Sequence, residues 1–191
     1  MNDPGAPSQP TQPLPNDPGG AGRDPWIRFA VTFGVLAILS ELVYYGVALE
    51  SALFRSYLET LASVSGFILS LLADDVSVRG TFVSGRIFSV EIARGCDAYR
   101  LCALLIAAML AFPSSLRLKA WGILLGLFWL NALNFLRICG LYFIGGYYYA
   151  HFQTSHEVYF PIFLIVMTVG AWILWVRRAT SEAYGSEPSP A

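Results

Sequence analysis

The sequence has few charges, few cysteines and few histidines, and each shortage excludes a class of protein. Charged residues make up 13% of the 191 residues and hydrophobic ones 55%, which is too apolar for an ordinary soluble domain. The net charge is −1 and no basic stripe is present, so we expect no nucleic-acid partner. The composition therefore predicts a membrane protein.

The three cysteines do not have the spacing of a zinc site, and we expect neither a metal nor another cofactor. Cys102 and Cys139 lie within apolar helical runs, where a cysteine usually acts as a small core side chain. Cys96 lies at the border between a polar, strand-like segment and an apolar helix, where a thiolate can form and react. A helix beginning beside it would favour the thiolate. Taken alone, Cys96 could also be an inert thiol.

Apolar runs at 26–49, 97–112, 120–149 and 158–176 predict about four transmembrane helices, since roughly 20 helical residues cross a bilayer. With one amphipathic or marginal helix at 51–72, they predict an all-α integral membrane bundle. We expect a disordered, Pro/Gly-rich tail at 1–24, a membrane-embedded domain at 25–178 and a disordered tail at 179–191.

The helix expected at 51–72 decides the topology. Its apolar residues fall on one stripe and its polar or small residues on another, namely Phe54, Leu58, Leu61, Val64, Ile68 and Leu72 against Arg55, Glu59, Ser63, Gly66 and Ser70. That pattern suits a helix lying in the interface. If it does not cross, one side holds six cations, and the positive-inside rule makes that side cytoplasmic: Arg23, Arg28, Arg117, Lys119, Arg177 and Arg178. If it crosses, Arg23 and Arg28 face outward; we prefer the non-crossing topology.

Residues 76–92 alternate apolar and polar side chains, which predicts two short strands with a turn at Ser84-Gly85. This β-hairpin would lie outside the cytoplasm and aim Cys96. Residues 151–157 predict a short polar loop on the same side. Glu41 stands out within the first span, either satisfied by a neighbouring helix or near the outer edge, or else taking part in chemistry.

The preferred topology brings three reactive side chains from separate segments to the outer leaflet. Cys96 is a candidate nucleophile, and His156 a candidate base that later protonates a leaving amine. Arg137 can donate to an oxyanion or bind a substrate carbonyl without losing its charge. An arginine buried in lipid is costly and implies a partner or a cavity.

Each of these residues has a structural alternative. His151 rivals His156, and Arg137 could pair with Glu41 as a bridge. Arg94 or Arg100 could supply the positive charge near Cys96. Asn131 and Asn134 could simply bond across helices.

The sequence resembles the exosortase/archaeosortase family over residues 76–176, and its short length and His-Glu pair look most like exosortase H. Four stretches in order carry the resemblance: Gly95-Cys96-Asp97-Ala98, Phe112-Pro113, Asn134-Phe135-Leu136-Arg137-Ile138 and Ser155-His156-Glu157. The family often has a small polar residue and a glycine after the cysteine, where this chain has Asp97 and Ala98. A charged Asp97 would raise the thiol pKa, so nearby cations must offset it.

The resemblance implies that residues 25–178 form the catalytic domain of a cysteine protease and transpeptidase. Its site would face the periplasm from the bacterial inner membrane. It implies Cys96 as nucleophile, Arg137 for the transition state or substrate and His156 as acid/base. We also expect Asn134, Arg100 and Glu157 to bind substrate. The expected partners are membrane lipid and exported proteins that end in a short motif, a transmembrane helix and a basic tail.

Two other functions remain open from the residues alone. The chain could be a non-enzymatic membrane scaffold or assembly subunit, in which Cys96 is dispensable and Arg137 and Glu41 are structural. It could also be a cysteine-dependent acyltransferase that acts on a lipid or glycan.

Overall fold

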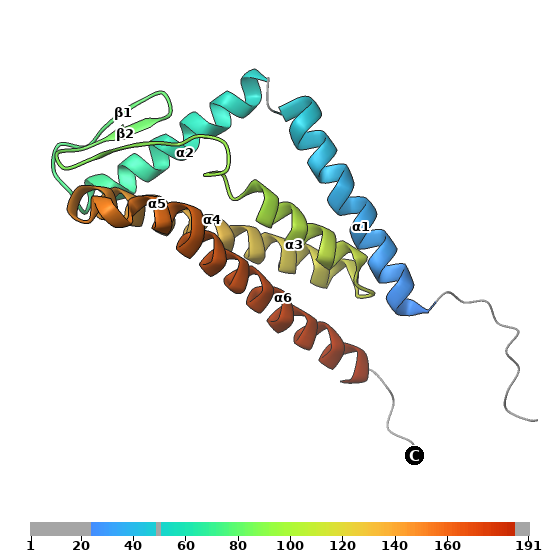
Figure 1. The fold of residues 1–191 in the computed structure, drawn as a ribbon. Coiled ribbons are helices and arrows are strands. Elements are labelled where there is room, and N and C mark those ends of the chain that lie inside the picture. Colours follow the sequence, from blue (N-terminus) through green and yellow to red (C-terminus); the bar gives the residue numbers. More distant parts are fainter. Residues whose placement is uncertain (1–23, 49–50, 186–191) are drawn as a thin grey trace, which may run out of the picture.

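The computed structural model describes residues 24–48 and 51–185 (Figure 1). The tail predicted at 1–24 falls outside this range except for Asp24, and so do the last six residues of the tail predicted at 179–191. Residues 179–185 are helical, because the last helix continues to Gly185.

The fold is a bundle of helices with a small antiparallel sheet at one end, as the sequence predicted (Figure 1). Three helical segments are long and apolar enough to cross a membrane: Pro25–Gly46, Leu116–Tyr147 and Tyr149–Ser181. They contain helices α1 (Pro25–Val43), α4 (Leu116–Tyr147) and α6 (Phe160–Gly185). The π-helical turn η1 (Tyr44–Ala48) extends α1.

The second predicted span forms a shorter helix. Helix α3 (Tyr99–Ala111) has 13 residues, about 20 Å of helix, less than the bilayer core of roughly 30 Å. It contacts α1, α4 and α6, and Leu105 and Met109 on it share a core with Leu130 and Trp175. Because the longer helices surround α3, its neighbours cover apolar surface that lipid would otherwise meet.

The cations that flank helices α1, α4 and α6 gather at one end of the bundle. Arg28 lies in the first turns of α1, Arg117 and Lys119 at the start of α4, and Arg177 and Arg178 near the end of α6. These ends of the three helices point the same way, and helix α2 and the sheet gather at the opposite end (Figure 1). This distribution matches the preferred topology, in which all these cations lie on one side.

Helix α2 (Ala52–Ser70) lies across the end of the bundle that holds the sheet (Figure 1). Ser51 caps it by accepting a hydrogen bond from the amide of Phe54, and the predicted apolar stripe is buried at Phe54, Leu58 and Leu61. Further along, the prediction was wrong. Val64 and Leu72 are exposed, while Ser65, Gly66 and Leu69 face inward. At Gly66, Val78 of the sheet packs so closely that a Cβ would collide with it.

The predicted hairpin has an additional strand. Strands β1 (Ser77–Arg79), β2 (Phe82–Ser84) and β3 (Ser89–Glu91) form an antiparallel sheet in the order β1-β2-β3. The sequence prediction missed the turn at Gly80-Thr81, where Gly80 has a φ of +59°, a conformation that suits glycine. The turn predicted at Ser84-Gly85 lies in the β2–β3 connection, where the Gly85 amide donates to the Phe88 carbonyl at 3.0 Å.

The sheet is fixed to the outer part of α4 by close contacts at small residues. Phe88 packs on Gly145 and Ile87 on Gly146, leaving no room for a Cβ at either glycine. The Ile87 amide donates to the Tyr142 hydroxyl at 3.4 Å, while Val83, Val90 and Ile92 are buried beneath the sheet. This docking sets the direction in which the chain leaves β3 toward Cys96.

The polar loop predicted at 151–157 is helical instead. A 3₁₀ turn η2 (Tyr149–His151), a short helix α5 (Phe152–Thr154) and a π-helical turn η3 (Ser155–Tyr159) run directly into α6. Ser155 is buried, and Gln153 donates to Glu157 one turn later. Polar side chains here line a helix rather than a loop, so His156 is held on a defined helical face.

Candidate active site

Cys96 lies in a tight turn between β3 and α3 that side chains of α4 hold from below. Gly95 has a φ of +87°, and the Cys96 amide donates to the Ala93 carbonyl at 3.1 Å. The amide of Asn134 donates to the Cys96 carbonyl at 2.8 Å, and Arg137 Nη1 to the Gly95 carbonyl at 3.1 Å. The backbone on both sides of the sulfur is therefore anchored to one helix.

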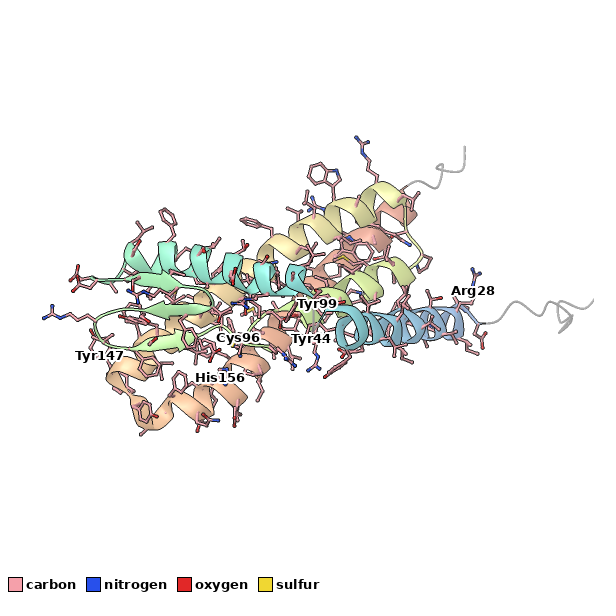
Figure 2. All side chains as sticks on the ribbon, turned by 90° about the horizontal axis from the view of Figure 1, so that it is seen from above. Arg28, Tyr44, Cys96, Tyr99, Tyr147 and His156 are labelled. Carbon is pink, nitrogen blue, oxygen red and sulfur yellow. The ribbon has the colours of Figure 1, made fainter. Side chains whose placement is uncertain are left out.

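The sulfur of Cys96 meets the imidazole of His156. Cys96 Sγ lies 3.6 Å from His156 Nε2, and Figure 2 shows the two side chains together, far from Arg28. The π-helical turn η3 carries His156, and such turns are frequent at functional sites. The ring of Phe152 stacks on the imidazole with 6.1 Å between centroids. His151, the rival histidine, is exposed, and the histidine within hydrogen-bond reach of Cys96 is His156.

Arg137 is the third side chain at this point. Its side chain is only 5% exposed, and its Nε has no hydrogen-bond partner among the described residues. Arg137 lies about 32 Å along α4 from Leu116, close to the thickness of a bilayer core. It does not pair with Glu41, which instead binds Arg100 at 3.2 Å. A buried guanidinium thus keeps one unused donor beside the cysteine turn.

The environment of Cys96 favours the neutral thiol. Burial raises the pKa of Cys96 above its ordinary value of 9.0, and the carboxylates of Asp97 and Glu91 also raise it. The Arg137 cation and a backbone hydrogen bond at Ala93 lower the pKa without reversing the shift. Cys96 is 5% exposed, so the expected thiolate at the water's edge is replaced by a buried thiol that needs a base. His156 is in position to act as that base.

This pKa shift has a measurable consequence. In a variant whose only cysteine is Cys96 (Cys102→Ala, Cys139→Ala), we expect labelling by a small methanethiosulfonate reagent to keep accelerating as the pH rises past 9.0, since only the thiolate reacts. Adding Arg137→Gln should move the midpoint to higher pH, because the Arg137 cation lowers the pKa. A labelling rate already at its plateau at neutral pH would contradict the neutral thiol.

Asp97 and Tyr44 support the turn in a way that the sequence did not predict. Asp97 is buried; its Oδ2 accepts from the Tyr44 hydroxyl at 3.2 Å and its Oδ1 from the Gly95 amide at 3.2 Å. The Tyr44 ring stacks on Tyr99, with centroids 4.8 Å apart, and Figure 2 shows these rings near Cys96. The acidic residue after the cysteine signalled an unusual environment, but nothing in the sequence pointed to Tyr44.

The three residues expected to bind substrate have different surroundings. Asn134 is buried and holds the Cys96 carbonyl, so its amide supports the turn instead of lining an open surface. Arg100 is exposed, pairs with Glu41 and Tyr45, and lies over the Tyr44 and Tyr45 rings. Glu157 is exposed beside His156 and accepts from Gln153. Glu41 is thus satisfied by a neighbouring helix, one of the expected alternatives.

Together these groups suit nucleophilic acyl transfer. Nucleophilic attack on a carbonyl requires a nucleophile, a base and a donor to the oxyanion. Here these are a thiol, an imidazole within reach of it, and a buried guanidinium with an unused donor. Over residues 24–48 and 51–185, no three His, Cys, Asp or Glu side chains come together as a metal site would need.

Comparison with known proteins places the chain in a family. Residues 22–173 match the family model described as Transmembrane exosortase (Exosortase_EpsH). No curated protein and no solved structure matches the chain. Because the match spans both the membrane helices and the Cys96 turn, this multi-pass membrane protein belongs to the transmembrane exosortases, a family of generally cysteine-dependent enzymes that process C-terminal sorting signals.

Proposed function

We propose that this chain is a cysteine protease and transpeptidase of the exosortase H type that cleaves C-terminal sorting signals of exported proteins. The observation that carries the proposal is the 3.6 Å approach of Cys96 Sγ to His156 Nε2, made by residues 60 positions apart on separate elements. A cysteine placed in this turn by chance would have no reason to approach the histidine of another segment. Asn134 and Arg137 hold the same turn.

In the proposed reaction, His156 removes the thiol proton as Cys96 attacks the scissile carbonyl carbon. The tetrahedral intermediate collapses when the C–N bond breaks and the imidazolium gives its proton to the leaving amine. The product is a thioester between Cys96 and the upstream part of the substrate. An acceptor nucleophile then displaces Cys96, which completes the transfer.

Arg137 is the proposed donor to the oxyanion or to a substrate carbonyl. Its Nη1 bonds the Gly95 carbonyl, but Nε has no partner among the described residues. A buried, unpaired donor costs free energy unless a ligand satisfies it. Charge that develops on the carbonyl oxygen would supply the missing acceptor, so this donor would bind the transition state more strongly than the ground state.

The proposed substrate ends in a short motif, a transmembrane helix and a basic tail. Its helix would pack beside α3 and α4, where a groove of about 380 Å³ lies between α1, α3 and α4. Small and apolar side chains line this groove, among them Ser40, Ala103 and Ala107, which lets a helix approach closely. Tyr99 at the start of α3 also lines it, so a helix in the groove would lead toward the Cys96 turn. Membrane lipid would surround the remaining apolar faces.

The proposed location is the inner membrane of a bacterium, with the site facing the periplasm. The cations at the ends of α1, α4 and α6 lie away from Cys96 and His156 (Figure 2 for Arg28). Lysine and arginine near membrane helices prefer the cytoplasmic side. That orientation puts the cysteine on the side where exported proteins arrive.

Trapping the covalent intermediate tests the proposal. The chain is co-expressed with an exported reporter that carries a sorting signal encoded in the same genome. Membranes that contain both proteins are then quenched in acid and denatured. We expect an adduct of chain and reporter that hydroxylamine removes, because hydroxylamine cleaves thioesters, and mass spectrometry should map it to Cys96. Cys102→Ala is the matched control and should keep the adduct. Cleaved reporter without a Cys96 adduct, even after rapid quenching, would contradict the thioester route.

A further inference from the structure

The sheet has an open edge at β3. In the order β1-β2-β3, β3 pairs with β2 on one side only, in the register Val83↔Val90. The strand is short, and both Ser89 and Glu91 are exposed while Val90 between them is buried. An edge strand leaves backbone donors and acceptors without partners, so it can template a further strand.

The hydrogen bonds of the ladder show which backbone groups are unused. The Ile92 amide donates to the Thr81 carbonyl at 2.9 Å, and the Gly85 amide to the Phe88 carbonyl at 3.0 Å. Antiparallel residues alternate between hydrogen-bonded and non-hydrogen-bonded pairs. The groups of Ser89 and Glu91 therefore point away from β2, and nothing in residues 24–48 or 51–185 bonds them.

This open edge leads directly to the candidate nucleophile. Four residues lie between Glu91 and Cys96, and the charge of the Glu91 carboxylate raises the pKa of the Cys96 thiol. At the other end of β3, the ring of Phe88 packs against Phe152, with centroids 5.2 Å apart. Phe152 in turn stacks on His156. The strand and the segment that carries His156 thus both run toward the sulfur.

We propose that the part of the sorting signal that contains the scissile bond binds as an additional β-strand along the open edge of β3, paired through the backbone of Ser89 and Glu91. This inference rests on the proposed function and adds how the substrate peptide is held. Main-chain pairing gives affinity with little demand on sequence, while alternate side chains read the motif. An extended peptide also exposes its carbonyl groups at regular spacing, as attack by a fixed thiol requires.

The charged residue Glu91 on the open edge is consistent with a peptide that binds there only transiently. Glu91 is exposed at the end of β3, and a charged residue on an edge strand discourages permanent pairing between copies of the chain. Three residues also give too few backbone bonds for a stable dimer through this edge. A substrate that is anchored in the same membrane needs only a few such bonds, because its membrane helix already holds it near the site.

A crosslinking scan tests the geometry. In the full chain without its native cysteines (Cys96→Ala, Cys102→Ala, Cys139→Ala), Ser89→Cys or Glu91→Cys is paired with single cysteines along the motif of the reporter, and a short bifunctional thiol reagent joins them. Strand pairing predicts crosslinks at every second reporter position. The best position should move by two residues between Ser89→Cys and Glu91→Cys. Crosslinks without alternation, or only between two copies of the chain, would overturn the proposal.

A second measurement separates this inference from the catalytic assignment. Glu91→Pro removes the outward amide but no bond to β2, and proline is tolerated on an open edge. Glu91→Gln is the control, since it loses the carboxylate and keeps the amide. We expect Glu91→Pro to process the reporter about tenfold more slowly than Glu91→Gln, the effect of about one lost hydrogen bond, with equal labelling of Cys96 in both. Equal processing would refute the strand but leave the role of Cys96 standing.

Discussion

Replacing Cys96 with alanine is expected to reduce cleavage of a sorting-signal reporter by about 10⁴-fold or more, as in hydrolases that lose their nucleophile. The physical reason is that no other described side chain can replace the sulfur at 3.6 Å from His156. Co-expression of a tagged reporter with the variant, followed by quantification of the cleaved form, measures the effect. The variant should still insert and fold, because the change removes only one buried atom.

Cys102→Ala and Cys139→Ala are the matched controls for this prediction. Both residues are free thiols on α3 and α4, whereas the sulfur that lies 3.6 Å from His156 Nε2 belongs to Cys96. We expect both variants to process the reporter within a few-fold of the native chain. If Cys96→Ala processed the reporter as well as these controls, the chain would act as a scaffold for another enzyme. Loss of lipid or glycan acylation, with normal reporter cleavage, would favour the acyltransferase instead.

The membrane helices were predictable because the length of each apolar run can be read directly from a continuous stretch of sequence. The runs that became α1, α4 and α6 are each long enough for a bilayer. The sequence also predicted that the second span stops at Pro113, since proline stops a helix, and α3 ends two residues earlier at Ala111. What the sequence did not disclose was that the second span would be short and surrounded by its neighbours, because that depends on how helices pack.

The errors arose where tertiary contacts override local pattern. Gly66 was assigned to the polar stripe of α2, yet Val78 of the sheet packs on it. Residues 151–157 looked like a loop because they are polar, although no glycine or proline interrupts the chain between residues 147 and 160. That absence was the available signal for a continuous helix. The missed turn at Gly80-Thr81 carried a signal too, a glycine between two short apolar-polar alternations.

The three reactive residues were predictable as types but their surroundings were not. Cys96, Arg137 and His156 stood out as a reactive or charged group in apolar context. Whether the thiol is ionised depends on its pKa, which burial, Asp97, Glu91 and Arg137 shift together. The spacing of residues along the sequence does not give the combined effect of these groups on the pKa. Glu41 forms its ion pair with Arg100 instead of Arg137. The sequence could not predict this choice of partner either, because it depends on how the helices pack.

Replacing Arg137 with lysine should separate charge from geometry at the site. We expect Arg137→Gln to lower reporter cleavage by about 10²- to 10³-fold, the usual cost of one oxyanion donor. Arg137→Lys keeps the cation that lowers the Cys96 pKa, so the pH midpoint of Cys96 labelling should stay near that of the native chain.

Arg137→Lys should nevertheless cleave almost as slowly as Arg137→Gln. Lysine offers a point charge and cannot donate to the Gly95 carbonyl and to a second acceptor from one planar fork. Native labelling with slow cleavage would identify the fork, rather than the charge, as what Arg137 supplies. Full recovery of cleavage by lysine would instead mean that Arg137 acts only as a cation on the thiol, and the unpaired Nε would then have no part in the reaction.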